Sequence, residues 1–175
     1  MITVLGIDPG LSSTGWGIIN VKNSKSKISY NGKYTFVDCG ILKTDTHDNL
    51  CDRLTFIYDS IYKLIKTTKP DRISIERVFV NINPASSEKL IMARTTAILA
   101  IAKTGHKYVE FAPNMIKKVI TGMGHGGKDL VKENVWKILQ PTASACHCPK
   151  TADASDALAI ALCAVMVEGD NCNGR

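Results

Sequence analysis

The sequence predicts a single α/β domain with a five-stranded mixed sheet flanked by helices. Three short β-rich segments lie in the first quarter of the chain and are typical of an antiparallel meander. After them, segments with helical spacing alternate with short apolar segments, as in strand–helix–strand units. The 175 residues match the size of one ordinary domain, and the chain contains no internal repeat. We therefore expect one domain over 1–168 and a short polar tail over 169–175.

The expected strands are marked by β-branched residues and bounded by turn residues. Segment 2–7 is apolar and ends at the turn-forming pair Pro9 and Gly10. The polar, lysine-rich segment 23–31 is typical of an extended hairpin tip. The remaining strands are expected at 14–21, 34–42, 72–76 and 107–111.

The expected helices follow from apolar residues that recur at helical steps. In 49–68 such residues form one stripe, and Pro70 ends the helix. A second helix begins at Pro84 or Ser86, runs to residue 103, and is followed by the terminator Gly105. The last three helices are expected at 113–120, 128–139 and 151–167, with a loop of four glycines in six residues at 122–127.

Composition and charge exclude several classes of protein. The chain is 45% hydrophobic and 22% charged, which is typical of a globular protein and not of a disordered or fibrous one. No basic n-region opens it, and its longest apolar run, 157–167, is too short to span a bilayer. We expect a cytoplasmic protein without membrane association and with reduced cysteines. The net charge of +6 suits a polyanionic partner such as nucleic acid, although it also serves solubility.

Four acidic residues occupy positions where carboxylates are expected to gather. Asp8 and Glu76 lie at the ends of the first and fourth strands. If those strands are parallel neighbours, both side chains emerge at the sheet edge where open α/β sheets bind ligands. Asp153 and Asp156 are three residues apart and share a face of the last helix, which continues as the apolar Ala157.

Acids placed on an apolar face are costly unless a positive charge compensates them. The helix dipole contributes at most ~1–2 kcal/mol to Asp153, which is too little for a group of carboxylates. A divalent ion meets the need, because magnesium and manganese prefer oxygen ligands. Two such ions about 4 Å apart can activate water and stabilise the leaving oxygen in phosphodiester hydrolysis.

Each acid also has an ordinary structural explanation. Asp8 could cap a turn, and Glu76 could be a strand-end residue paired with Arg77. Asp153 could be a first-turn helix acid and Asp156 a surface acid. The four together, at two strand ends and on one helix face, favour a functional group.

At these residues the chain resembles the RuvC family of Holliday-junction resolvases, over about residues 1–167. The order and the spacing of the motifs match, and the combination is highly specific. The matching strings are LGIDPG at 5–10, TGWG at 14–17, IERVF at 75–79, GMG at 122–124 with Lys128, and DASDALAIA at 153–161. Two segments depart from the family pattern: the longer hairpin at 23–33 and the loop at 143–150.

The resemblance implies a ribonuclease-H-like fold and a homodimer that binds four-way DNA junctions and nicks two strands symmetrically. It implies metal-dependent phosphodiester hydrolysis in homologous recombination and repair, alongside the RuvA–RuvB branch-migration complex. The family's carboxylates carry over onto Asp8, Glu76, Asp153 and Asp156, which would bind two Mg²⁺ ions, with Mn²⁺ as a substitute. Some relatives have histidine at the first position of the last pair, where this chain has aspartate.

The resemblance also points to residues that would hold DNA. Phe79 corresponds to an aromatic residue near the junction centre, where stacking contributes ~1–3 kcal/mol per base; the alternative is a core phenylalanine. Lys117 and Lys128 match basic positions of the family, and Lys132 lies with them around the glycine-rich loop. Lysines there attract phosphates in a salt-dependent way, although Lys118 or Lys132 could belong to a solvated face.

Other interpretations remain for the same residues. A sugar-kinase or actin-like ATPase also opens with a strand, an aspartate and a glycine turn, but the chain is short for two lobes. Another ribonuclease-H-like nuclease would act on RNA or hybrids, and a catalytically silent DNA-binding module would not need all four acids. A zinc site at Cys146, His147 and Cys148 is disfavoured because no second ligand pair is obvious.

Overall fold

Five strands form one mixed sheet in the order β3-β2-β1-β4-β5, which confirms the predicted fold class. The computed structural model describes residues 1–22, 34–78, 84–123, 127–140 and 151–167. Strands β1 to β3 pair antiparallel, whereas β1, β4 and β5 run parallel. The strands are β1 (Ile2–Asp8), β2 (Ser13–Val21), β3 (Tyr34–Lys43), β4 (Arg72–Glu76) and β5 (Tyr108–Phe111).

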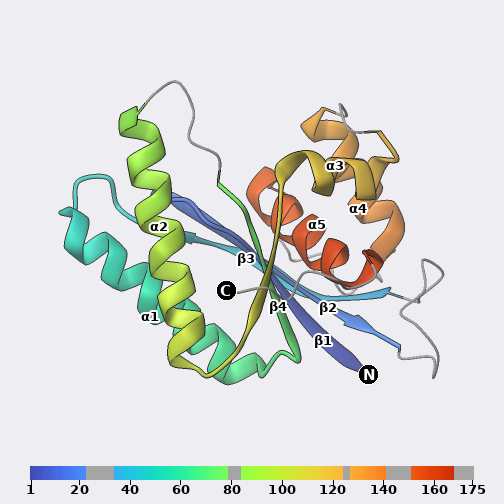
Figure 1. Cartoon of the computed structure of the whole chain (residues 1–175), viewed down its shortest axis with the longest axis horizontal. Helices are drawn as coiled ribbons and strands as arrows, with labels where there is room; N and C mark the ends of the chain where they lie inside the picture. The colour runs from blue at the N-terminus through green and yellow to red at the C-terminus, as the bar shows by residue number, and fades with distance from the viewer. Residues whose placement is uncertain (23–33, 79–83, 124–126, 141–150, 168–175) are drawn as a thin grey trace.

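Helices cover both faces of this sheet (Figure 1). Helices α1 (Leu50–Thr68) and α2 (Pro84–Lys103) lie together on one face. The other face carries α3 (Pro113–Thr121), α4 (Lys128–Leu139) and α5 (Ala152–Met166). The start of α2 at Pro84 decides between the two starts that the sequence allowed. Across the described part of the chain, no helix is long and apolar enough to cross a membrane.

Local capping explains where two of these helices begin and end. Asn49 precedes α1, and its side chain accepts a hydrogen bond from the backbone N–H of Asp52 at 3.0 Å. Lys69 follows α1 in the left-handed conformation. Thr151 precedes α5 and accepts from the N–H of Ala154 at 3.4 Å. The predicted helical segments 49–68 and 151–167 therefore included their capping residues.

Two hydrophobic cores lie on the two faces of the sheet. In β1, Leu5 and Ile7 point to the core shared with α1 and α2, whereas Val4 points to the core around α5. Successive strand residues alternate between faces, so Gly6 and Asp8 lie on the α5 side with Val4. The end of β1 thus carries its carboxylate toward the face that α5 covers.

Helix α5 is the central helix of its layer and is more enclosed than the sequence predicted. Residues 157–166 are all buried, not one apolar stripe alone, because α5 lies between the sheet and helices α3 and α4. It approaches the sheet very closely. A Cβ atom on Gly6 would lie 2.1 Å from the carbonyl oxygen of Ala157, and one on Gly15 would lie 2.2 Å from that of Asp153. Glycine at these two positions sets the distance between α5 and the strands.

Candidate active site

Asp8 and Glu76 end two adjacent parallel strands. The register of β1 and β4 pairs Ile7 with Ile75, so the residues that follow them lie side by side at one sheet edge. Glu76 lies on the same face as Ser74, whose buried hydroxyl donates to the carbonyl oxygen of Ile160 in α5 at 3.1 Å. Both carboxylates therefore emerge at the carboxyl edge and on the α5 face. The first and fourth strands are therefore parallel neighbours, as the prediction from the sequence required.

The first turn of α5 lies at the same edge. Gly15 pairs with Asp8 across β1 and β2, and its Cα faces the backbone of Asp153. Asp156 follows on the same helix face, one turn further along. All three other acids act electrostatically on Asp8. The structure thus brings the four predicted acids together, while their roles in metal binding and catalysis stay predictions.

The environment of these acids disfavours their negative charge. Desolvation, followed by repulsion from Glu76 and then from Asp156 and Asp153, holds the pKa of Asp8 well above its ordinary value. Desolvation also raises the pKa of Glu76 to about 6, with a further contribution from Asp156. A side-chain hydrogen bond with Asp8 opposes part of this rise. The pKa of Asp156 is raised by desolvation, against the attraction of Lys128.

Two of the predicted lysines act on these acids. The Nζ of Lys128, at the start of α4, lies 3.7 Å from Oδ2 of Asp156. Its charge lowers the pKa values of Asp8, Glu76 and Asp156. Lys117 in α3 acts in the same direction on Glu76 and Asp156. The side chain of Lys128 is 75% exposed, so it pairs with Asp156 while it remains open to solvent.

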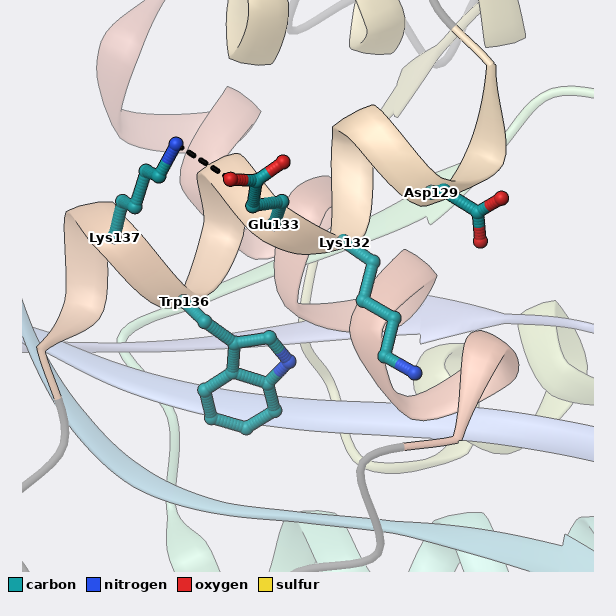
Figure 2. Close-up of a pocket in the computed structure, with 5 residues that line it drawn as sticks. All are labelled: Asp129, Lys132, Glu133, Trp136 and Lys137. Atoms are coloured by element: carbon teal, nitrogen blue, oxygen red, sulfur yellow. Dashed lines mark ion pairs between the residues drawn. The ribbon is translucent and has the colours of Figure 1, made fainter.

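Lys132 is not among the charges that act on Asp8, Glu76 or Asp156, and Phe79 lies outside the described residues. Lys132 lines a surface hollow on the outer side of α4 together with Asp129, Glu133, Trp136 and Lys137 (Figure 2). Within that group Lys137 pairs with Glu133 at 2.7 Å. The hollow contains none of the four acids. The hairpin segment 23–33 and the residues 146–148 also lie outside the described residues.

Three side chains near the acids were not predicted from the sequence: Arg94, Glu110 and Ser13. Arg94 of α2 donates from Nε to the backbone carbonyl oxygen of Glu76 at 3.3 Å and also pairs with Glu110. Arg77 pairs with Glu110 at 3.1 Å. The alternative in which Arg77 serves as the partner of Glu76 therefore finds no support in the described contacts. Ser13, the first residue of β2, donates to Oδ2 of Asp153 at 2.5 Å.

Only Ser13 had a sequence signal, and the signal was weak. It is a hydroxyl residue in the short turn between Asp8 and the second strand. Arg94 and Glu110 carried none, because a helix arginine and a strand glutamate are ordinary surface residues in a sequence.

The donor chemistry of the group fits a hard divalent cation. All four side chains offer carboxylate oxygens, which magnesium, manganese and calcium prefer. Desolvation and mutual repulsion raise the pKa values of Asp8 and Glu76 although Lys128 is present. Among the described residues, no three acids hold their side chains in a ready-made ligand arrangement. Mutual repulsion favours wider spacing of carboxylates until a cation compensates them.

This fold and this site define a class: α/β proteins with a group of carboxylates at the carboxyl edge of a mixed sheet. Comparison with known proteins narrows the class. Residues 4–164 match the family model described as crossover junction endodeoxyribonuclease RuvC. A protein of that name from Rhizobium leguminosarum bv. trifolii is 38% identical over 170 residues, or 97% of this chain and 93% of its own. A protein of the same name from Rhodopseudomonas palustris is 40% identical over 161 residues, which is 92% of this chain and 85% of its own.

Solved structures agree on the fold. Thermus thermophilus RuvC in complex with a Holliday junction substrate superposes with a TM-score of 0.79 at 24% identity, covering 93% of this chain and 92% of its own. Such structures have a ribonuclease-H-like fold, which confirms that expectation. The chain belongs to the RuvC family of crossover junction endodeoxyribonucleases.

Proposed function

We propose that this chain resolves four-way DNA junctions by metal-dependent hydrolysis of phosphodiester bonds, in homologous recombination and DNA repair. The observation that carries the proposal is the gathering of Asp8, Glu76, Asp153 and Asp156 at one sheet edge. Membership in a family of junction endonucleases supports it, and the family implies dependence on a divalent metal ion.

We assign the metal to Mg²⁺, two ions in each site, with Mn²⁺ as a substitute. Asp8, Glu76, Asp153 and Asp156 are the residues that would hold these ions. When bound there, such ions would provide the activation of water and the charge stabilisation that phosphodiester hydrolysis needs. The protein's part is to hold the carboxylates in place and to keep their charge compensated. Lys128 is positioned for the second task, because its ammonium group lies 3.7 Å from Asp156.

The DNA would approach the acids past Lys128 and Lys117. Lys128 is exposed beside the acids, where it can contact the phosphate that is cut. Lys132 would contact the backbone further out, over the outer side of α4. Phe79 would stack on an unpaired base at the junction centre. Lys128→Ala should reduce the salt dependence of junction binding by about one charge. An unchanged slope and affinity would remove Lys128 from the phosphate contacts.

A homodimer through α2 would supply the second active site. Symmetric nicking of two strands needs two acidic groups related by twofold symmetry. Helix α2 exposes Ile91 and Leu99 to solvent at 42% and 60% of their surfaces. The exposed Thr95 lies between them at four-residue steps, so the three share one face. We assign this face to contact with a second copy of the chain.

The cellular setting follows from the same proposal. The enzyme would act in the cytoplasm on junctions that the RuvA–RuvB complex moves. A test of that partnership is whether purified RuvA–RuvB of the same organism stimulates cleavage by this chain.

The central experiment compares substrates. Purified protein is incubated with a synthetic four-way junction, a linear duplex and an RNA–DNA hybrid, with and without Mg²⁺, and the nicks are mapped. We expect paired nicks in the junction, in strands of like polarity, only with metal. Preferential cutting of the hybrid would favour a different ribonuclease-H-like nuclease. Tight junction binding without nicks at any divalent metal would favour a silent DNA-binding module.

A further inference from the structure

Ser13 connects the strand beside Asp8 to one of the other acids. Its Oγ donates a hydrogen bond to Oδ2 of Asp153 at 2.5 Å, across 140 positions of sequence. Bonds from a hydroxyl to a carboxylate are shorter and stronger than those between neutral groups. The bond engages one carboxylate oxygen, and it limits rotation of a side chain that lies in the partly open first turn of α5.

The turn that carries Ser13 has a fixed path. The buried hydroxyl of Thr14 donates to the carbonyl oxygen of Gly10 at 2.7 Å and accepts from its N–H at 3.2 Å. From the other side, the hydroxyl of Thr44 donates to the carbonyl oxygen of Leu11 at 2.6 Å. Because these bonds hold the turn at both ends, the Ser13 hydroxyl has a defined position relative to the acids.

The neighbouring serine shows that the contact is specific to position 13. The hydroxyl of Ser12 accepts a hydrogen bond from Nη2 of Arg53, in α1, at 3.0 Å. Ser12 and Ser13 are adjacent in the sequence, but their hydroxyls bind different groups. Ser12 binds Arg53 in α1, whereas Ser13 binds Asp153. Ser12 thus provides a matched control for Ser13.

We propose that Ser13 is a positioning residue of the nuclease site, holding the Asp153 carboxylate in the orientation from which it binds a divalent cation. The inference rests on the proposed role of Asp153 as a metal ligand. Ser13 acts through Asp153 and need not touch the DNA. Loss of a hydrogen-bonding partner behind a metal ligand typically lowers metal affinity or activity by about 10- to 100-fold.

The test uses the full chain in four forms: wild type, Ser13→Ala, Ser13→Thr and Ser12→Ala. Mn²⁺ binding to the DNA-free protein is measured by electron paramagnetic resonance, and junction cleavage is measured against metal concentration. We expect Ser13→Ala to weaken Mn²⁺ binding by about 10-fold and to raise the metal concentration for half-maximal cleavage similarly. Junction affinity without metal should not change. Ser13→Thr, which keeps a hydroxyl, should restore most of the binding, and Ser12→Ala should resemble wild type.

Three results would overturn the proposal. Wild-type Mn²⁺ binding by Ser13→Ala would show that the hydroxyl does not matter. Equal losses in Ser13→Ala and Ser13→Thr would show that something other than the hydroxyl matters. A Ser13→Ala variant that loses stability and junction affinity with unshifted metal dependence would show a purely structural role.

Asp153→Asn, measured in parallel, separates this inference from the proposed function. Wild-type cleavage by Asp153→Asn would refute the proposed metal site itself. An inactive Asp153→Asn beside a normal Ser13→Ala would reject the role of Ser13 alone.

Discussion

At the scale of single residues, the acids are held close together at a cost to the folded protein. Asp8 is desolvated and is repelled by the three other acids, while Lys128 compensates only part of that charge. Groups whose pKa values are displaced by burial and by like charges are typical of functional sites. Because these pKa shifts are upward, ionisation of the acids opposes folding of the metal-free protein.

The Asp8→Asn substitution separates catalysis from stability. It removes one desolvated ionisable group, so the metal-free variant should unfold at a higher temperature than wild type. Junction cleavage should fall by at least about 100-fold. Loss of the hydrogen-bonding partner behind a metal ligand can already cost that much, and loss of the ligand itself should cost no less. Thermal unfolding followed by circular dichroism and a timed junction-cleavage assay give the two measurements. Wild-type cleavage by this variant would refute the metal site.

Titration of Glu76 gives a pH dependence of stability in the metal-free protein. Its pKa is about 6 in the folded protein against an ordinary value of 4.5, so the folded state retains the proton longer than the unfolded state. Stability from this group is present below pH 4.5 and is lost as the pH rises through about 6.

The matched variant for this titration is Glu76→Gln, which cannot ionise. Urea denaturation of both proteins between pH 4 and pH 7, without divalent metal, measures the difference. As the pH rises from 4.5 to about 6, the variant should become more stable relative to wild type. A gap that stays constant with pH would show that Glu76 ionises normally.

At the scale of secondary-structure elements, the distance between α5 and the sheet decides where the acids lie. Gly6 of β1 and Gly15 of β2 allow the helix backbone to touch the strands. Ser74 of β4 continues this contact with its hydrogen bond to Ile160. Small residues on three adjacent strands thus form the surface on which α5 rests, and Asp153 and Asp156 are placed by that contact.

Gly15→Ala tests this arrangement. The added Cβ would meet the backbone oxygen of Asp153 at 2.2 Å, and backbone cannot move aside as a flexible side chain does. We expect a loss of about 1–3 kcal/mol in the free energy of unfolding, together with reduced cleavage. Urea denaturation and the junction assay measure the two effects.

Gly127→Ala is the control for the stability measurement, because a Cβ at Gly127 meets no atom within 4 Å. Its effect should be about 1 kcal/mol or less, as for substitution of a helix-capping glycine. Equal stability of the Gly15→Ala variant and wild type would contradict the close-contact explanation.

At the scale of the whole molecule, the two faces of the sheet present different groups. The acids lie on the face that α5 covers, whereas α2 covers the opposite face and exposes apolar residues. Arg94 connects the two sides, because it extends from α2 to the backbone of Glu76. In a dimer formed through α2, the hydrogen bond of Arg94 would therefore connect the interface helix of each protomer to Glu76 of the same protomer.

Leu99→Glu tests the proposed dimer face. A charge at Leu99, an apolar residue of α2 that is 60% exposed, should shift the protein to monomer in analytical ultracentrifugation, because an unpaired buried charge is costly. Paired nicking should then fall more than single nicking. Val37→Glu, at an apolar residue of β3 that is 44% exposed, should remain dimeric. A dimeric Leu99→Glu protein would place the interface elsewhere.

The sequence by itself determined the elements, the sheet-edge acids and the family. Strand alternation, helical spacing and helix-ending residues such as Pro70 act between near neighbours, so they can be recognised along the chain. Asp8 and Glu76 could be placed at one edge because parallel strands end together. Family motifs named Asp153 and Asp156, although no local rule places a helix acid beside a strand acid.

Only the tertiary structure decided which side chains serve those acids. Ser13 lies 140 positions from Asp153, and Arg94 lies 18 positions from Glu76 on another element. Lys128 and Lys132 look alike in the sequence, yet only Lys128 pairs with an acid of the site, whereas Lys132 lines a separate hollow. These choices depend on strand register and on how closely α5 packs against glycine. Both are fixed by contacts between distant segments, and the local sequence does not encode such contacts.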